Sequence, residues 1–220
     1  MDILVTGFGP FPHVRVNPTA RLAEAVARRL AAAGLDAQAL ILETSYAGGL
    51  PALRAALAQH RPRAILMLGL AARARFIRVE LLARGHASAL HPDVSGKAPG
   101  PDRLRIPPLP ARTTANPHAA LAALRQHGLR SRLSPSAGRY LCDASYATAL
   151  AATKGTGIPI IFIHVPWLRP DPGQRRRDKV RAFRPGPARL ARALAAFGAE
   201  LARSGRANDT AMRRRLRHTV

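Results

Sequence analysis

The chain has 220 residues, of which 47% are hydrophobic, and this length and composition suit one domain with a substantial core. Its 35 Lys and Arg residues far outnumber its 12 Asp and Glu residues, which gives a formal net charge of +23. The single cysteine excludes an internal disulfide, and no apolar run approaches the roughly 20 residues that a transmembrane helix needs. We therefore expect a soluble, cytoplasmic protein with no membrane-spanning segment.

The positive charge has two interpretations. A strong excess of arginine is typical of nucleic-acid-binding proteins. However, the arginines are spread along the chain, with runs only at Arg175–Arg177 and Arg213–Arg215, and the 5% aromatic content offers few platforms for stacking bases. We favour a compositional origin, with weak nonspecific polyanion binding as a by-product. Neither His86 nor His91 has a cysteine or carboxylate at metal-ligand spacing, so we expect no metal and no other cofactor.

Strand and helix patterns alternate along the chain. The first half predicts a strand at Ile3–Phe8, a helix from Asn17 to Gly34, a strand at Ala37–Leu42, a helix at Gly49–His60 and a strand at Ala64–Leu70. The second half predicts a mixed strand at Arg75–Ala83, a long excursion over His86–Thr114, a helix from Asn116 to near Gly128, a short strand, a helix around Cys142, a strand at Ile158–His164 and a helix at Pro187–Arg203.

This alternation predicts the fold class. Strands separated by helices of this length indicate an α/β fold with a mainly parallel central sheet between helical layers. The sequence contains no internal repeat and no linker between two domains. We therefore expect a single domain over residues 1–204, followed by a basic and flexible C-terminal tail at residues 205–220.

The cysteine marks the first candidate site. Cys142 ends the stretch Ser136-Ala137-Gly138-Arg139-Tyr140-Leu141-Cys142, in which a glycine-containing turn leads into a helix. The unpaired N–H groups and the positive dipole at a helix start favour the thiolate, which is the nucleophilic form of cysteine. The alternative is that Cys142 is a small buried hydrophobic residue, which is the commoner role of a lone cysteine.

Two further side chains would complete a thiol acyl-transfer site with Cys142. His164 ends the apolar strand, and open α/β sheets gather their chemistry at the carboxyl ends of their strands. Glu80 lies among apolar residues, where a buried carboxylate needs a partner. From the spacing alone, His164 is equally compatible with a satisfied core histidine, and Glu80 with a solvent-facing residue on an edge strand.

Four sequence anchors together resemble pyroglutamyl peptidase type I, the C15 family of cysteine peptidases. In chain order they are Val5-Thr6-Gly7-Phe8-Gly9-Pro10-Phe11 with Asn17-Pro18-Thr19, Gly69-Leu70-Ala71 leading to Glu80, Ser136 to Cys142, and Phe162-Ile163-His164-Val165-Pro166. The resemblance extends from Met1 to about Arg169. It implies a three-layer α/β/α fold, release of N-terminal pyroglutamyl residues from peptides, and a homo-oligomer, because relatives often form tetramers.

The resemblance also implies the site residues: Glu80, Cys142 and His164 as the catalytic triad, and Phe8, Phe11 and Asn17 as contacts to the lactam ring. In this mechanism the Cys142 thiolate attacks the pyroglutamyl carbonyl and His164 protonates the departing amine. Glu80 holds the imidazole in its orientation and tautomer. The expected substrates are peptides with an N-terminal pyroglutamate.

The chain departs from the family pattern close to these motifs. The departures lie at Pro12, His13, Arg78, Leu81, Leu90, Pro135 and Asp143. An ionised Asp143 close to the sulfur of Cys142 would oppose formation of the thiolate. Two alternatives to a fully active peptidase therefore stay open: a diverged relative with weak or no catalysis, and a basic nucleic-acid-binding protein on the same scaffold.

Overall fold

The computed structural model describes residues 1–12, 14–85, 90–99, 110–170 and 183–217. A central six-stranded sheet has the order β2-β1-β3-β8-β4-β7. Its strands are β1 (Ile3–Phe8), β2 (Ala37–Leu42), β3 (Ile65–Leu70), β4 (Ile77–Glu80), β7 (Ser131–Ser134) and β8 (Ile160–Val165). Neighbouring strands are parallel except β4 and β8, which pair antiparallel. The prediction of a mainly parallel sheet is confirmed.

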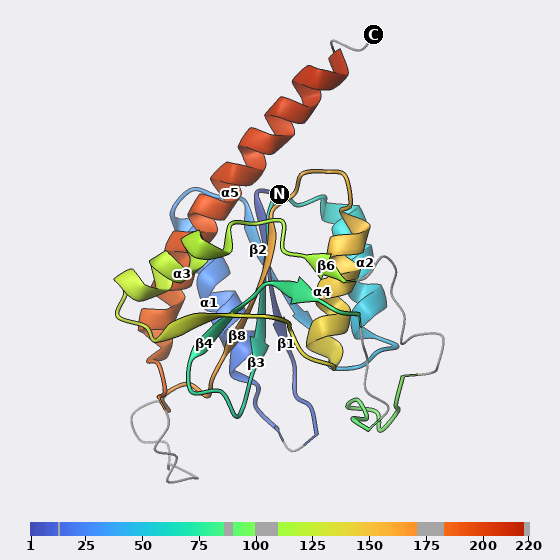
Figure 1. Ribbon diagram of the computed structural model, residues 1–220, viewed down its shortest axis with the longest axis vertical. Helices are drawn as coiled ribbons and strands as arrows, with labels where there is room; N and C mark the ends of the chain where they lie inside the picture. The colour runs from blue at the N-terminus through green and yellow to red at the C-terminus, as the bar shows by residue number, and fades with distance from the viewer. Residues whose placement is uncertain (13, 86–89, 100–109, 171–182, 218–220) are drawn as a thin grey trace.

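Helices cover both faces of this sheet (Figure 1). One face carries α1 (Pro18–Ala32), α3 (Pro117–Gln126) and α5 (Pro187–Arg217), whose apolar side chains form one core cluster with the sheet. The other face carries α2 (Gly49–His60) and α4 (Leu141–Ala152), which form a second cluster. The three-layer α/β/α architecture is therefore confirmed.

The alternation of side chains along the strands decides which face receives the candidate site. In β8, Ile161 and Ile163 point into the core shared with α1, α3 and α5, whereas Phe162 belongs to the core on the side of α2 and α4. Since successive side chains of a strand point to opposite faces, His164 lies on the same side as Phe162. The histidine therefore faces the layer that contains Cys142.

The boundaries of most elements follow the sequence patterns, with one split strand. The predicted mixed strand at Arg75–Ala83 divides at Leu81, because β5 (Leu82–Ala83) leaves the central sheet and pairs antiparallel with β6 (Ala111–Arg112). Within the predicted excursion, residues 86–89 and 100–109 lie outside the described part of the chain, as do His13 and the run Arg175–Arg177.

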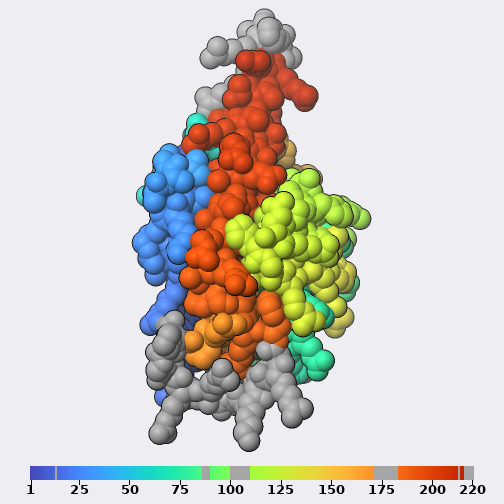
Figure 2. All heavy atoms as spheres, turned by 90° about the vertical axis from the view of Figure 1, so that its left-hand side faces the viewer, coloured from blue at the N-terminus to red at the C-terminus, as the bar shows by residue number. Residues whose placement is uncertain are grey.

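The C-terminal helix corrects one prediction. We expected a helix ending at Arg203 and a frayed tail after Gly205, but α5 continues to Arg217. Gly205 allows α5 to pass close to the backbone of Arg63. A Cβ atom at position 205 would lie 2.0 Å from the carbonyl oxygen of Arg63. Asn208 then donates to the carbonyl of Gly157 at 2.7 Å. Figure 2 shows α5 between α1 and α3 and extending past both helices.

With 31 residues, α5 is long enough to cross a membrane, but it is rich in arginine. In the described part of the chain, no helix combines the length and the apolar character needed to cross a membrane.

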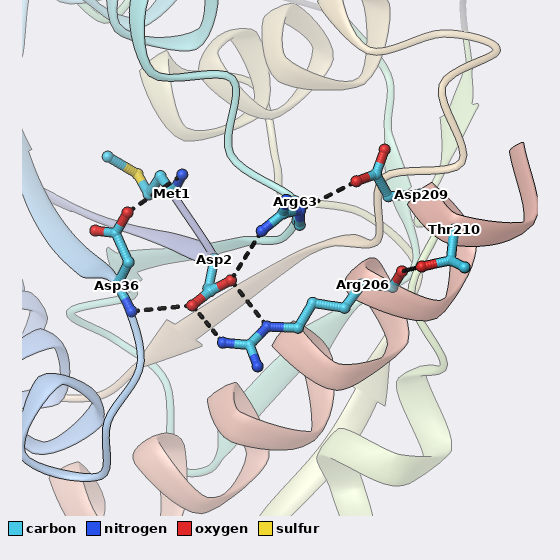
Figure 3. A network of polar contacts seen from close by, with 7 residues as sticks. All are labelled: Met1, Asp2, Asp36, Arg63, Arg206, Asp209 and Thr210. Carbon is cyan, nitrogen blue, oxygen red and sulfur yellow. Dashed lines mark hydrogen bonds and ion pairs between the residues drawn. The ribbon is translucent and has the colours of Figure 1, made fainter. Parts of the chain in front are cut away.

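A network of charged groups attaches α5 to the start of the chain (Figure 3). The buried carboxylate of Asp2 accepts from Nε of Arg206 at 2.8 Å and from Nη1 of Arg63 at 3.2 Å, and it also pairs with Nη2 of Arg206. The backbone N–H of Asp36 donates to the same carboxylate at 3.0 Å. Arg63 also donates to Asp209 at 3.1 Å. Asp2 therefore links the start of the chain to the middle of α5.

We expect Asp2→Asn to lower the free energy of unfolding by roughly 2 kcal/mol at neutral pH, because two arginines lose their shared anion. Hydrogen bonding to Arg206 is the main cause that holds the pKa of Asp2 below its usual range. A carboxyl group with a lowered pKa stabilises the folded state at neutral pH, and this contribution is lost as the pH falls below about 4. Urea unfolding at neutral and acidic pH measures both effects.

Asp36→Asn is the matched control for this prediction. Its carboxylate pairs with the N-terminal amine at 3.3 Å but is 62% exposed, and exposed pairs contribute little, at most about 1 kcal/mol. Equal unfolding free energies for wild type and Asp2→Asn at neutral pH would contradict the proposed role of the network.

Candidate active site

His164 and Glu80 form a buried pair at the centre of the molecule. Nδ1 of His164 lies 2.9 Å from Oε1 of Glu80, and the two side chains come from adjacent strands, β8 and β4. His164 is 6% exposed and Glu80 is completely buried. The interpretation of Glu80 as a solvent-facing residue on an edge strand is wrong, because β4 lies inside the sheet between β8 and β7.

Aromatic packing fixes the orientation of the imidazole. The ring of Phe162 lies against His164 with centroids 4.8 Å apart. On the neighbouring strand, Gly69 faces both rings, and a Cβ atom there would come within 2.9 Å of them. Gly69 therefore leaves the space that His164 occupies, and it belongs to one of the sequence anchors.

Cys142 lies in the first turn of α4 and is partly exposed. Tyr140, two residues before Cys142, is the N-cap in an extended conformation and offers no side-chain cap. The N–H groups of Asp143 and Ala144 donate to the carbonyl of Tyr140, whereas the N–H of Cys142, at the second position of the helix, has no intrahelical acceptor. The interpretation of the cysteine as a fully buried hydrophobic residue does not fit this exposure.

Cys142 and Glu80 both affect the pKa of His164. Burial alone would lower its pKa, but the charge of Cys142, a hydrogen bond to Cys142, and the bond to Glu80 together raise the pKa to about 9. Because Nδ1 faces Glu80, Nε2 is the ring nitrogen that remains for the sulfur of Cys142. The imidazole is thus protonated at neutral pH between a sulfur and a carboxylate.

Phe8 ends β1 near this cluster, and Phe11 lies in the loop that follows. Phe8 is buried, and its ring lies 6.4 Å from that of Phe162, which in turn contacts His164. Phe11 is half-buried and forms a bridge with Val14. The backbone N–H of Phe8 donates to the hydroxyl of Thr19 at 3.0 Å, which ties the loop to α1.

Asn17 stabilises the same loop from within the protein. Its Oδ1 accepts from the N–H of Thr19 at 3.1 Å as the N-cap of α1, and its Nδ2 donates to the carbonyl of Gly9 at 3.1 Å. The side chain is 5% exposed. A direct contact between Asn17 and a substrate stays a prediction, whereas its contribution to the shape of the loop is evident from these bonds.

Comparison with known proteins is decisive for the family. The model of the family described as pyroglutamyl peptidase matches residues 1–181. This chain belongs to the pyroglutamyl peptidase family. The pyrrolidone-carboxylate peptidase of Gloeobacter violaceus is 32% identical over 174 residues, covering 76% of this chain and 82% of that protein. That of Streptomyces coelicolor is 34% identical over 169 residues, covering 75% and 77%.

Solved structures of pyroglutamyl peptidases have the same fold. Pyroglutamyl peptidase I of Bacillus amyloliquefaciens superimposes with a TM-score of 0.77 at 26% identity, covering 91% of this chain and 96% of that structure. Pyrrolidone carboxyl peptidase of Thermus thermophilus gives a TM-score of 0.72 at 27% identity, covering 92% and 99%. The resemblance stated from the sequence anchors is confirmed.

Six of the departures from the pattern of the pyroglutamyl peptidase family lie within the described part of the chain. Asp143 is buried, but its Oδ1 accepts from the backbone N–H of Arg84 at 2.8 Å, so the carboxylate holds the segment after β5. Arg78 lies directly opposite His164 in the β4–β8 pair. Leu90 is 86% exposed, and Pro135 is also exposed. The remaining described departures, Pro12 and Leu81, are half-buried.

Two tyrosines near the cluster escaped the sequence analysis. Burial, together with the charge of Glu80, raises the pKa of Tyr146, which is completely buried in α4. Tyr46 follows the carboxyl end of β2 and lies near Cys142, whose charge acts on it. The sequence did offer a signal for Tyr46, because residues that directly follow a parallel strand often belong to the functional site of an α/β protein. Tyr146 carries no such signal, because its apolar helical neighbours make it look like an ordinary core residue.

Proposed function

We propose that this chain removes N-terminal pyroglutamyl residues from peptides through a thioester on Cys142. The observation that carries the proposal is the buried pair of His164 and Glu80, with 2.9 Å between Nδ1 and Oε1, together with a partly exposed Cys142 whose charge raises the pKa of His164. Three elements distant in sequence contribute one side chain each. A nucleophile, a base and a group that orients the base are the components of a thiol acyl-transfer site.

The first half-reaction uses the charges of this cluster. The thiolate of Cys142 attacks the carbonyl carbon of the pyroglutamyl residue and forms a tetrahedral oxyanion, for which the backbone N–H of Cys142 is a donor. The bond to the peptide nitrogen then breaks, and that nitrogen takes the proton from Nε2 of His164. The products of this step are the free peptide amine and a thioester.

The second half-reaction regenerates the enzyme. Nε2 of the now neutral His164 takes a proton from water, and the hydroxide attacks the thioester carbon. The carbon–sulfur bond breaks, which releases pyroglutamic acid and restores the thiolate of Cys142. Throughout, Glu80 accepts from Nδ1, which keeps the imidazole in one tautomer and stabilises its protonated form.

An uncharged lactam ring suits the pocket that we assign to Phe8 and Phe11. An ordinary N-terminal residue would bring a charged α-amine against apolar rings, which costs desolvation without a partner. A site whose polar groups match a lactam should therefore reject proline and alanine derivatives. The same reasoning supports peptides with N-terminal pyroglutamate as the substrates.

The test is release of a fluorescent amine from L-pyroglutamyl, prolyl and alanyl derivatives by the full chain. We expect kcat/KM for the pyroglutamyl derivative to exceed the other two by at least about 10²-fold. Treatment with iodoacetamide should abolish the activity, because Cys142 is the only cysteine. Absence of pyroglutamyl release, or activity that survives alkylation, would overturn the proposal.

We further propose that the protein works in the cytoplasm, where thiols are kept reduced. Exposed arginines on two helices of one face support weak binding of polyanions in addition: Arg21, Arg28, Arg29, Arg189, Arg192 and Arg203. Retention on heparin that disappears with moderate salt would fit this property. A homo-oligomer stays a prediction.

A further inference from the structure

Tyr46 carries an unused hydrogen-bond donor. The residue follows β2, is 4% exposed, and belongs to the core cluster that also contacts Cys142. Its hydroxyl oxygen is inaccessible to solvent and has no hydrogen-bond partner among the described residues. Buried hydroxyl groups in folded proteins are nearly always paired, so an unpaired one needs an explanation, and an acceptor supplied by a ligand is one.

The surroundings of Tyr46 fix its position. Its backbone N–H donates to Oδ2 of Asp93 at 3.1 Å, while Oδ1 of Asp93 accepts from the N–H groups of Ser95 and Lys97 at 2.9 and 3.1 Å. The ring packs edge-on against Tyr140, with centroids 6.2 Å apart. The hydroxyl is therefore presented by a hydrogen-bonded loop and a packed ring, which is a preorganised arrangement.

The neighbouring Tyr140 offers a useful contrast. Its hydroxyl donates to the carbonyl oxygen of Pro92 at 3.0 Å, so its donor is used within the protein. Both tyrosines lie close to the nucleophile, but only the hydroxyl of Tyr46 lacks an acceptor among the described residues. Of these two tyrosines, Tyr46 is therefore the one whose hydroxyl is available to a ligand, whereas Tyr146, whose hydroxyl is also unpaired among the described residues, lies in the core beside Phe162.

Tyr46 stays protonated and therefore keeps a hydrogen to donate. Burial is the main cause that raises its pKa, followed by the charges of Tyr140, Asp93 and Cys142. A neutral phenol beside a thiolate is a donor for an uncharged acceptor such as a carbonyl oxygen. The ring of Tyr46 also packs against Tyr140, the N-cap of the helix whose first turn carries Cys142, so the phenol lies close to that turn.

The order of the strands in the sheet separates the region of His164 from the region of Tyr46. His164 and Glu80 come from β8 and β4, towards one end of the sheet, whereas Tyr46 follows β2 at the other end. The departing amine must lie on the side of His164, which protonates it. The acyl part of the substrate therefore extends towards Tyr46 and the loop that contains Phe8.

We propose that Tyr46 determines specificity by donating its hydroxyl hydrogen to the lactam carbonyl oxygen of the pyroglutamyl ring. This inference rests on the proposed function, since it names a polar contact of the same acyl pocket. It explains why a polar group is kept in an otherwise apolar environment. A ring that lacks the carbonyl leaves the phenol unpaired and is rejected.

A binding experiment tests the contact without catalysis. Calorimetry measures the affinity of 2-pyrrolidone, which has the lactam but no scissile bond, for Cys142→Ala and for Cys142→Ala with Tyr46→Phe. We expect Tyr46→Phe to weaken binding by about tenfold, the loss of one hydrogen bond. Tyr140→Phe, which removes a hydroxyl with an internal acceptor, should leave the affinity unchanged. Equal affinities with and without the Tyr46 hydroxyl, or no lactam binding at all, would overturn the inference.

Measurements of stability and activity on Tyr46→Phe provide a second test, because we expect the stability to be kept and the activity to fall. Tyr46→Phe should leave the unfolding midpoint unchanged or raise it, since the lost hydroxyl has no partner among the described residues, while kcat/KM for a pyroglutamyl amide falls about tenfold. A drop in stability with unchanged kcat/KM would assign Tyr46 a structural role instead.

The two proposals fail in different ways. If Cys142→Ala binds the lactam in a Tyr46-dependent manner but wild type shows no turnover, the inference about Tyr46 stands and the catalytic proposal fails. If wild type hydrolyses pyroglutamyl amides and Tyr46→Phe does so equally well, only the inference about Tyr46 fails.

Discussion

Cys142→Ala is expected to lower kcat for pyroglutamyl release by at least about 10⁴-fold, because no other group in the cluster can form the thioester. The partly exposed thiol contributes little packing, so the unfolding midpoint should stay close to that of wild type. Steady-state kinetics and thermal unfolding on the same preparation separate the two effects. Turnover that persists in Cys142→Ala would mean that another residue is the nucleophile.

The same variant changes the ionisation of His164 in a measurable way. The charge of Cys142 and a hydrogen bond to it are leading causes that raise the pKa of His164 to about 9 against the effect of burial. Removing the sulfur should therefore lower that pKa, which titration of the imidazole proton resonances by NMR detects. An unchanged titration would show that the sulfur and the imidazole are not coupled.

Glu80→Gln is expected to lower kcat by about 10²–10⁴-fold, with a much smaller change in KM. The variant keeps the size of the side chain but removes the negative charge that stabilises the imidazolium. The hydrogen bond at 2.9 Å also selects the tautomer of His164, and an amide at this position can present its NH₂ group to Nδ1 instead. Kinetics at saturating substrate measure the loss, and a kcat within about twofold of wild type would contradict the role of Glu80.

The pH profile of Glu80→Gln follows from the raised pKa of His164. Protonated His164 is the acid that releases the peptide amine, so wild-type activity should fall as the pH rises through about 9. Loss of the Glu80 charge lowers this pKa and moves the alkaline limb to lower pH. A raised histidine pKa also stabilises the folded protein below about 6.5, and this contribution is lost as the pH rises through about 9. The variant should show a weaker decline of unfolding free energy over this interval.

The local elements of the fold were predictable from particular residues. Asn17 with Pro18, and Asn116 with Pro117, mark helix starts because an Asn side chain caps the first turn and proline needs no N–H there; both caps are present. The apolar run of β8 predicted a strand with His164 near its carboxyl end, and the structure contains it. These signals depend on neighbours within a few positions, so the sequence carries them directly.

The extent of α5 was not predictable in the same way. Gly205 looked like the end of a helix, since glycine commonly terminates helices. In the structure, this glycine instead allows close packing against the carbonyl of Arg63, and Asp2 binds Arg206 one residue later. Both partners lie far away in the sequence, so no local pattern distinguishes a helix end from a close contact.

The sequence by itself determined the alternation of strands and helices, the family, and the candidate triad of Glu80, Cys142 and His164. Only the tertiary structure decided that Glu80 is buried and paired, because that depends on β4 inserting antiparallel between β8 and β7. It also decided the environment of Tyr46, whose hydroxyl is isolated by residues distant in the chain. The physical reason is the same in both cases: burial and hydrogen bonding of a polar side chain depend on which distant segments pack around it, and short-range sequence patterns do not encode that packing.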